Sequence, residues 1–175
     1  MSKAFTSEET PDNEIVVRPR APLPPGVPNW VTPRGLQSLR SEENALDRER
    51  ARLQQDAVDD ESGRSRRLAV LSARIAELSE RLANAQLVPV PDRAPETVRF
   101  GTTVTLRTIS GARAGEQRRF QIVGVDEANP DDGRVAFTSP IARAILGRSI
   151  GDEAILRLPR GEEALEIVDI DYEQR

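Results

Sequence analysis

A seven-residue repeat of apolar side chains between residues 68 and 85 constrains this chain most strongly. Apolar residues recur there at alternating spacings of three and four, the a/d pattern of a helix that packs along another helix. The positions are Leu68, Leu71, Ile75, Leu78, Leu82 and Ala85, and a less regular strip precedes them at Leu36, Leu39, Leu46 and Leu53. Because neither strip is buried alone, the two predict an antiparallel helical hairpin. Arms of about 25 residues would project roughly 35–40 Å.

The turn between the two strips is strongly acidic. It carries Asp56, Asp59, Asp60 and Glu61. In the simpler interpretation this is a solvated loop in which Asp59 or Asp60 caps the second helix, whose N-terminus favours negative charge. In the other, the carboxylates form a tip that meets Mg²⁺ or a basic surface on another molecule, because Mg²⁺ needs only one or two protein carboxylates.

Residues 1–29 are predicted to be a disordered, proline-rich leader. The stretch "EETPDNE" is acidic, and "RPRAPLPPGVP" favours extended polyproline II without helix or sheet pairing. The coiled-coil hairpin is expected over residues 30–87, with Thr32 as the cap and Pro33 as the first helical residue. Trp30 lies just outside the cap and is expected to pack back on the first turn.

The pattern changes after "VPVPDRAP", residues 88–95, which is expected to be a linker. Alternating, β-branched stretches follow, and "AILRL" and "ALEIVDIDY" flank "PRGEE", a hairpin signal. The stretch "SPIARAILG" predicts a short helix capped by Ser139. Residues 96–175 are thus expected to form an α+β domain, an antiparallel sheet of about five strands with one helix against it. Its core is expected to include Phe100, Phe120, Phe137 and Tyr172.

Composition excludes several classes of function. The chain contains no cysteine and no histidine, which removes disulfides, thiolate metal sites and the commonest general base. Any metal would be a hard cation held by carboxylates, and no intrinsic metal site is predicted. The net charge of −4 argues against a general nucleic-acid coat. No membrane span and no secretory signal are evident, so we expect a cytoplasmic protein without membrane contact.

Several segments together resemble the bacterial Gre transcript-cleavage factors. They are the capped hairpin, the helix end "LANAQLVPV", the strand entry "VRFGTTVTL", and the stretches "RFQIVGVDEA", "SPIARAILG" and "IGDEAILRLPRGEEALEIVDIDYE". The resemblance extends over residues 30–173. It implies a coiled-coil hairpin joined to an FKBP-like domain that docks beside the secondary channel of RNA polymerase. The hairpin would enter the channel, where acids at its tip help to hold the second catalytic Mg²⁺ while the polymerase cleaves its own backtracked transcript.

The same resemblance assigns candidate contact residues and a role. The helix at "SPIARAILG" would lie near the polymerase, with Ser139, Pro140, Ile141 and Arg143 as candidate polymerase-binding residues. In the simpler interpretation this helix only seals the sheet. The protein would be a monomeric regulator and not an enzyme, would reach nucleic acid only through the polymerase, and would need no cofactor beyond an Mg²⁺ ion shared with the polymerase active site.

The hairpin tip departs from the family pattern. Gre tips resemble "GDLxENAEY", and this chain has no such run. The hairpin is also about a dozen residues shorter, which withdraws the tip by roughly 9 Å. We therefore expect weak transcript cleavage or none. Two alternatives stay open: a coiled-coil adaptor that binds another partner, and prolyl isomerisation, against which an aromatic content of 3% argues.

Overall fold

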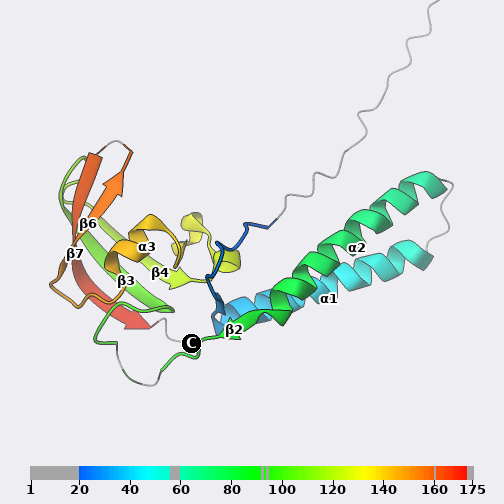
Figure 1. Cartoon of the computed structure of the whole chain (residues 1–175), viewed down its shortest axis with the longest axis horizontal. Helices are drawn as coiled ribbons and strands as arrows, with labels where there is room; N and C mark the ends of the chain where they lie inside the picture. Colours follow the sequence, from blue (N-terminus) through cyan, green and yellow to red (C-terminus); the bar gives the residue numbers. More distant parts are fainter. Residues whose placement is uncertain (1–19, 56–59, 92, 94, 160, 173–175) are drawn as a thin grey trace, which may run out of the picture.

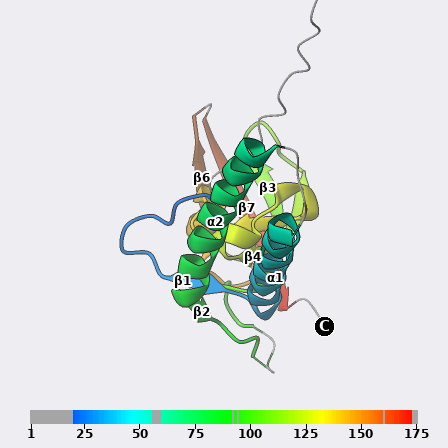
Figure 2. The ribbon, with the colours of Figure 1, turned by 90° about the vertical axis from the view of Figure 1, so that its right-hand side faces the viewer.

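The computed structural model describes residues 20–55, 60–91, 93, 95–159 and 161–172. These residues form a globular domain and a helical hairpin that projects away from it (Figure 1). Viewed from the hairpin side, the two helices lie in front of the sheet of the domain (Figure 2). Within the described ranges, no helix combines the length and the apolar composition that crossing a lipid bilayer requires.

The hairpin consists of α1 (Pro33–Gln55) and α2 (Glu61–Ala83), each of 23 residues. Helix α1 begins as predicted, because the Thr32 hydroxyl accepts a hydrogen bond from the backbone N–H of Gly35 at 3.0 Å. The imperfect seam position Glu43 accepts a hydrogen bond from Ser79 of α2 at 2.7 Å. The apolar seam between the helices is confirmed by a buried or partly buried cluster that comprises Val31, Leu36, Leu39, Leu46, Leu53, Leu71, Ile75, Leu78, Leu82 and Ala85.

Two short strands that the sequence did not predict close the base of the hairpin. Strand β1 (Asn29–Val31) pairs in parallel with β2 (Ala85–Leu87). The side-chain amide of Asn29 also donates a hydrogen bond to the carbonyl of Arg81 at 2.8 Å. The base of the hairpin therefore includes chain from before α1 as well as chain from after α2.

Residues 20–28, expected to belong to the disordered leader, form no helix or strand, but they contact the rest of the molecule. Strand β1 begins at Asn29, and Val27 packs against the core of the domain. The carbonyl of Ala21 accepts a hydrogen bond from Arg81 at 2.6 Å. A proline-rich segment offers few N–H groups to a sheet, but its carbonyls and side chains can still bond to neighbouring helices. Residues 1–19 lie outside the described ranges.

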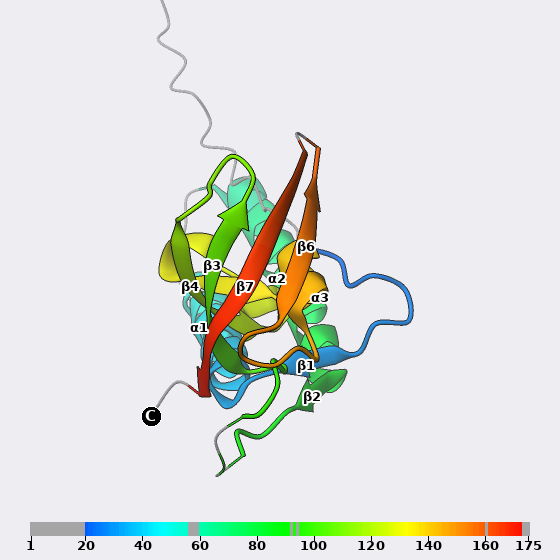
Figure 3. The same ribbon diagram turned by 90° about the vertical axis from the view of Figure 1, so that its left-hand side faces the viewer.

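The globular domain is built on one five-stranded sheet, drawn face-on in Figure 3. Its strands are β3 (Thr102–Ser110), β4 (Gln117–Val123), β5 (Arg134–Ala136), β6 (Glu153–Leu158) and β7 (Gly161–Tyr172). Their spatial order is β5-β4-β3-β7-β6. Helix α3 (Pro140–Ile145) packs beside β6 at one edge. The predicted α+β domain of five strands and one helix is therefore confirmed.

The sheet is mixed and not purely antiparallel, which corrects the predicted pairing. Strand β5 runs parallel to β4, whereas the other neighbouring strands are antiparallel. Between β4 and β5 the chain passes through two 3₁₀ turns, η1 (Val125–Glu127) and η2 (Pro130–Asp132). Gly133 then reverses the chain at a φ of 66°. These turns carry the chain back along the edge of β4, so that β5 starts at the same end as its neighbour.

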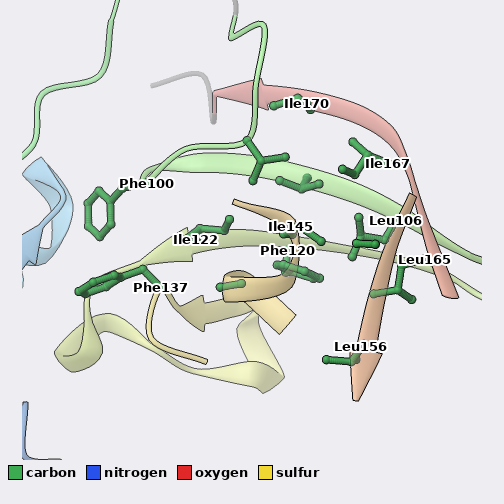
Figure 4. Close-up of a cluster of buried hydrophobic side chains, with 14 residues drawn as sticks. Phe100, Leu106, Phe120, Ile122, Phe137, Ile145, Leu156, Leu165, Ile167 and Ile170 are labelled. Carbon is green, nitrogen blue, oxygen red and sulfur yellow. The ribbon is translucent and has the colours of Figure 1, made fainter. Parts of the chain in front are cut away.

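One face of the sheet and helix α3 enclose the core (Figure 4). Three of the four predicted aromatic residues are buried there, namely Phe100, Phe120 and Phe137. Tyr172 is an exception, because it is the last residue of β7 and is only half-buried. The aliphatic core residues labelled in Figure 4 are Leu106, Ile122, Ile145, Leu156, Leu165, Ile167 and Ile170.

A buried carboxylate fastens the β3–β4 loop to strand β7. The side chain of Glu163 is 4% exposed and accepts hydrogen bonds from Arg113 at 2.9 and 3.2 Å and from Arg118 at 3.3 Å. The hydrogen bonds from Arg113 are the main reason that the pKa of the Glu163 carboxyl lies below its ordinary value, against the opposing effect of burial. The charged form of Glu163 is therefore the stabilising one.

We predict that Glu163→Gln lowers the free energy of unfolding by about 1 kcal/mol at neutral pH. Because the folded pKa is depressed, the contribution of Glu163 is complete above the ordinary glutamate pKa of 4.5 and is lost as the pH falls through the lower folded value. Urea unfolding at pH 7 and at pH 3 measures both effects. Glu162→Gln is the control, because the Glu162 side chain is 60% exposed in its pair with Arg157. Equal losses in the two variants would contradict the prediction.

Candidate functional site

The hairpin tip contains two described acids, and both lie at the start of α2. Asp60 is the cap of this helix, and its carboxylate accepts a hydrogen bond from the backbone N–H of Gly63 at 3.0 Å. Glu61 is the first helical residue, and its side chain is 86% exposed at 3.8 Å from Arg64. Asp56 and Asp59 lie outside the described residues. In the part of the chain that the structure describes, no three acids are grouped closely enough to hold a metal ion.

Helix α3 divides its residues between the core and the surface. The Ser139 hydroxyl caps the helix by accepting a hydrogen bond from Ala142 at 3.3 Å. Ile141 is half-buried and packs partly on the core. Pro140 and Arg143 are exposed. Of the four candidate contact residues on this helix, these two therefore offer the freest surface to a partner.

An open groove of about 830 Å³ runs between α3 and β6. The helix side and the segment that follows it contribute Pro140, Arg143, Ala144 and Arg148. The strand side contributes Glu153, Ile155, Leu156 and Arg157. Three arginines and one glutamate make this groove positively charged around an apolar floor, and we call it the arginine groove.

The joint between hairpin and domain centres on a buried glutamate. Glu127 in η1 is 8% exposed, and its carboxylate accepts hydrogen bonds from the backbone N–H of Thr32 at 2.9 Å and from the Thr32 hydroxyl. It also accepts a bond from the backbone N–H of Gly124 at 3.3 Å. In an ordinary capping box the carboxylate comes from the third residue of the helix itself. Here that residue is Gly35, and a Cβ atom on it would lie 1.9 Å from the Glu127 side chain. The globular domain therefore supplies part of the cap of α1.

A cluster of ion pairs surrounds this cap. The side chain of Asp126 is 4% exposed and lies 3.2 Å from Arg81 of α2 and 3.3 Å from Arg20. Arg20 also contacts Glu42 of α1 at 2.5 Å, and its backbone N–H donates to Glu77 at 3.1 Å. Arg20 thus links both helices to η1, and the chain that follows it crosses the joint.

Trp30 packs against the domain and not on the first turn of α1 as predicted. Its ring centroid lies 5.7 Å from that of Phe100 and 5.1 Å from that of Phe137. The two phenylalanine rings are 5.6 Å apart, so the three rings form a closed cluster. Since Trp30 lies in β1, three residues before the first residue of α1, the cluster fixes the base of the hairpin to the core of the domain.

A projecting hairpin, a polar joint and an arginine groove together define a two-part protein that presents a helical arm from a small sheet domain. The family model described as "Transcription elongation factor, GreA/GreB, C-term" matches residues 93–172. The GreA elongation factor of Francisella philomiragia is 33% identical over 157 residues, which cover 81% of this chain and 95% of that protein. The chain therefore belongs to the GreA/GreB family of transcription elongation factors, as the resemblance predicted.

Other relatives match over a shorter region. The GreA factor of Hyphomonas neptunium is 38% identical over 102 residues, which cover 58% of this chain and 63% of that protein. Among solved structures, the GreA factor homolog 1 protein of Thermus thermophilus is 24% identical, with coverage of 82% of this chain and 99% of that chain and a TM-score of 0.38. The GreA/GreB factor of Nitrosomonas europaea is 20% identical, with coverage of 83% and 99% and a TM-score of 0.40.

We predict that Glu127→Ala opens the joint while the sheet stays folded. The substitution leaves the backbone N–H groups of Thr32 and Gly124 without their acceptor, at a cost of about 1–3 kcal/mol. Trp30 is the only tryptophan of the chain, so its fluorescence reports on the joint directly. We expect its emission to shift to longer wavelength as water reaches the ring. In the Glu163→Gln variant the substitution lies on β7 and not at the joint, so the tryptophan emission should stay unchanged. An unshifted spectrum for Glu127→Ala with unaltered stability would refute the assignment of Glu127 to the joint.

Proposed function

We propose that this protein binds RNA polymerase through the surface of α3 and the arginine groove, and that its hairpin enters the secondary channel. Membership of the GreA/GreB family is the observation that carries the proposal. The joint supports it, since a hairpin must be held in a defined direction if docking of the domain is to guide it into a channel. In this role the protein is a monomeric regulator in the cytoplasm, and the chemistry belongs to the polymerase.

The tip chemistry favours occupancy of the channel over strong stimulation of transcript cleavage. Asp60 is used as a helix cap, and the chain lacks the "GDLxENAEY" run. Bonds between Mg²⁺ and oxygen are close to ~2.1 Å, so a tip withdrawn by roughly 9 Å cannot supply a ligand through side-chain rotation alone. Charge still acts over this range, because the Debye length is about 8 Å at physiological salt. The tip acids thus perturb the shared Mg²⁺ or nucleotide entry without ligating the metal.

We expect Arg143→Glu to weaken binding to core RNA polymerase by roughly tenfold, or ~1.4 kcal/mol. Reversing an exposed charge on α3 places like charges against the proposed partner surface. The matched control is Arg119→Glu, which reverses an exposed arginine on β4 at a distance from the groove. A binding titration compares both with Asp60→Asn, which keeps a good helix cap. If only the tip substitution weakened binding, the hairpin and not the domain would carry the affinity. No binding by the wild type would favour a coiled-coil adaptor with another partner.

A neutralised tip tests the mechanism. Replacing Asp56, Asp59, Asp60 and Glu61 together by Asn and Gln preserves the cap and the side-chain sizes. On a backtracked elongation complex we expect little RNA cleavage with the wild type, slower nucleotide addition, and relief of that slowing by the neutralised tip. Strong cleavage by the wild type that the neutralised tip abolishes, with binding intact, would mean that the short hairpin does deliver a metal ligand.

A further inference from the structure

Two arginines of the arginine groove, Arg143 and Arg148, have no carboxylate partner among the described residues, because no acid there lies within ion-pair distance of either side chain. The Arg148 side chain donates a hydrogen bond to the carbonyl of Ala144 at 3.1 Å. Arg157 has a partner in Glu162 at 3.0 Å, but its side chain stays 85% exposed. Glu153 is the sole acid on the groove lining, so with Arg157 paired to Glu162 the two remaining arginines, Arg143 and Arg148, still leave the groove with a net positive charge.

The edge strand that lines the groove suits the binding of an extended chain. Strand β6 is the last strand of the sheet and pairs only with β7 among the described strands. The free edge of such a strand exposes backbone N–H and C=O groups that an extended segment can pair with. Ile155, which is 51% exposed, adds an apolar contact on the same lining. The free edge of β6, the apolar lining of the groove and its arginines are together suited to bind an acidic peptide in an extended conformation.

We infer that the acidic N-terminal segment of this same chain, residues 8–14, docks in the arginine groove. Its sequence "EETPDNE" contains Glu8, Glu9, Asp12 and Glu14 and no basic residue. The docking itself does not depend on RNA polymerase. Its consequence rests on the proposed function: the segment covers the surface that the polymerase would use, and the two compete for the groove.

The length of the leader permits this contact. Arg20 is held at the joint by Glu42 and Asp126. At 3.3–3.6 Å per residue, Glu14 can lie up to ~20 Å from Arg20 and Glu8 up to ~40 Å. A domain of about 80 residues has a radius of gyration close to 12 Å and is roughly 30 Å across. In Figure 3 the segment that begins at residue 20 lies on the side of the domain that carries α3 and β6, away from β4. The acids of the leader can therefore reach the groove.

Peptide binding in trans tests the docking. The probe is a fluorescein-labelled peptide of residues 1–19, titrated at low salt against full-length protein in which Glu8, Glu9, Asp12 and Glu14 are replaced by Gln or Asn. We expect a Kd of about 0.1 mM that weakens as salt screens the charges. Wild-type protein should bind the same peptide roughly tenfold more weakly, because its own leader competes at an effective concentration on the order of 1 mM.

Two further variants assign the site. In the neutralised-leader background, Arg143→Glu with Arg148→Glu should abolish peptide binding, whereas Arg119→Glu on β4 should leave it unchanged. The inference is overturned if the peptide fails to bind the neutralised-leader protein, if the wild type binds it equally well, or if loss of the groove arginines has no effect.

Polymerase binding separates this inference from the proposed function. If both hold, the neutralised leader tightens binding to core RNA polymerase severalfold. If peptide binding behaves as expected and neither protein binds polymerase, the proposed function is wrong and the docking stands. If polymerase binds and the peptide experiments fail, the docking is wrong and the proposed function stands.

Discussion

The hydrogen bonds between Glu127 and Thr32 decide how the two halves of this protein are arranged. The first N–H groups of a helix need hydrogen-bond acceptors from outside the helix. At the start of α1, one such acceptor is the carboxylate of Glu127, 95 residues further along the chain. Because that carboxylate is buried, any displacement of the hairpin base leaves polar groups unsatisfied in a water-poor environment. The ion pairs of Asp126 and the aromatic cluster of Trp30 surround the same point, so the direction of the hairpin is determined by the globular domain.

The sequence predicts those parts of the fold that depend on near neighbours. The seam of α1 and α2 follows from a repeat of three and four, and Thr32 and Ser139 are recognisable as caps because the residues after them begin helices. The joint could not be predicted in this way. Nothing within a few residues of Glu127 distinguishes a buried acceptor from a surface glutamate. The one local signal is Gly35, a poor helix former in the first turn of α1, whose missing side chain leaves room for Glu127.

The same distinction between local sequence signals and tertiary packing applies to the candidate site. Exposure of Arg143 follows from helical periodicity, and the capping role of Asp60 was one of two interpretations open from sequence. The arginine groove was not foreseen, because it arises only where α3 packs beside the edge strand β6 and brings Arg148 and Arg157 to one surface. The parallel direction of β5 was not predicted for a related reason. The polar residues between β4 and β5 are equally compatible with a tight turn that would make the two strands antiparallel.

The contacts that fix the hairpin to the domain lie at the base of the hairpin. The direction of the hairpin and its length can therefore change independently of each other. The base determines where the arm points, and the number of heptads in α1 and α2 determines how far it extends. Adding or deleting seven residues in each arm would move the tip by about 10.5 Å and leave the seam in register. Evolution or protein engineering can therefore change how far the tip extends from the domain without altering Glu127, Trp30 or Asp126.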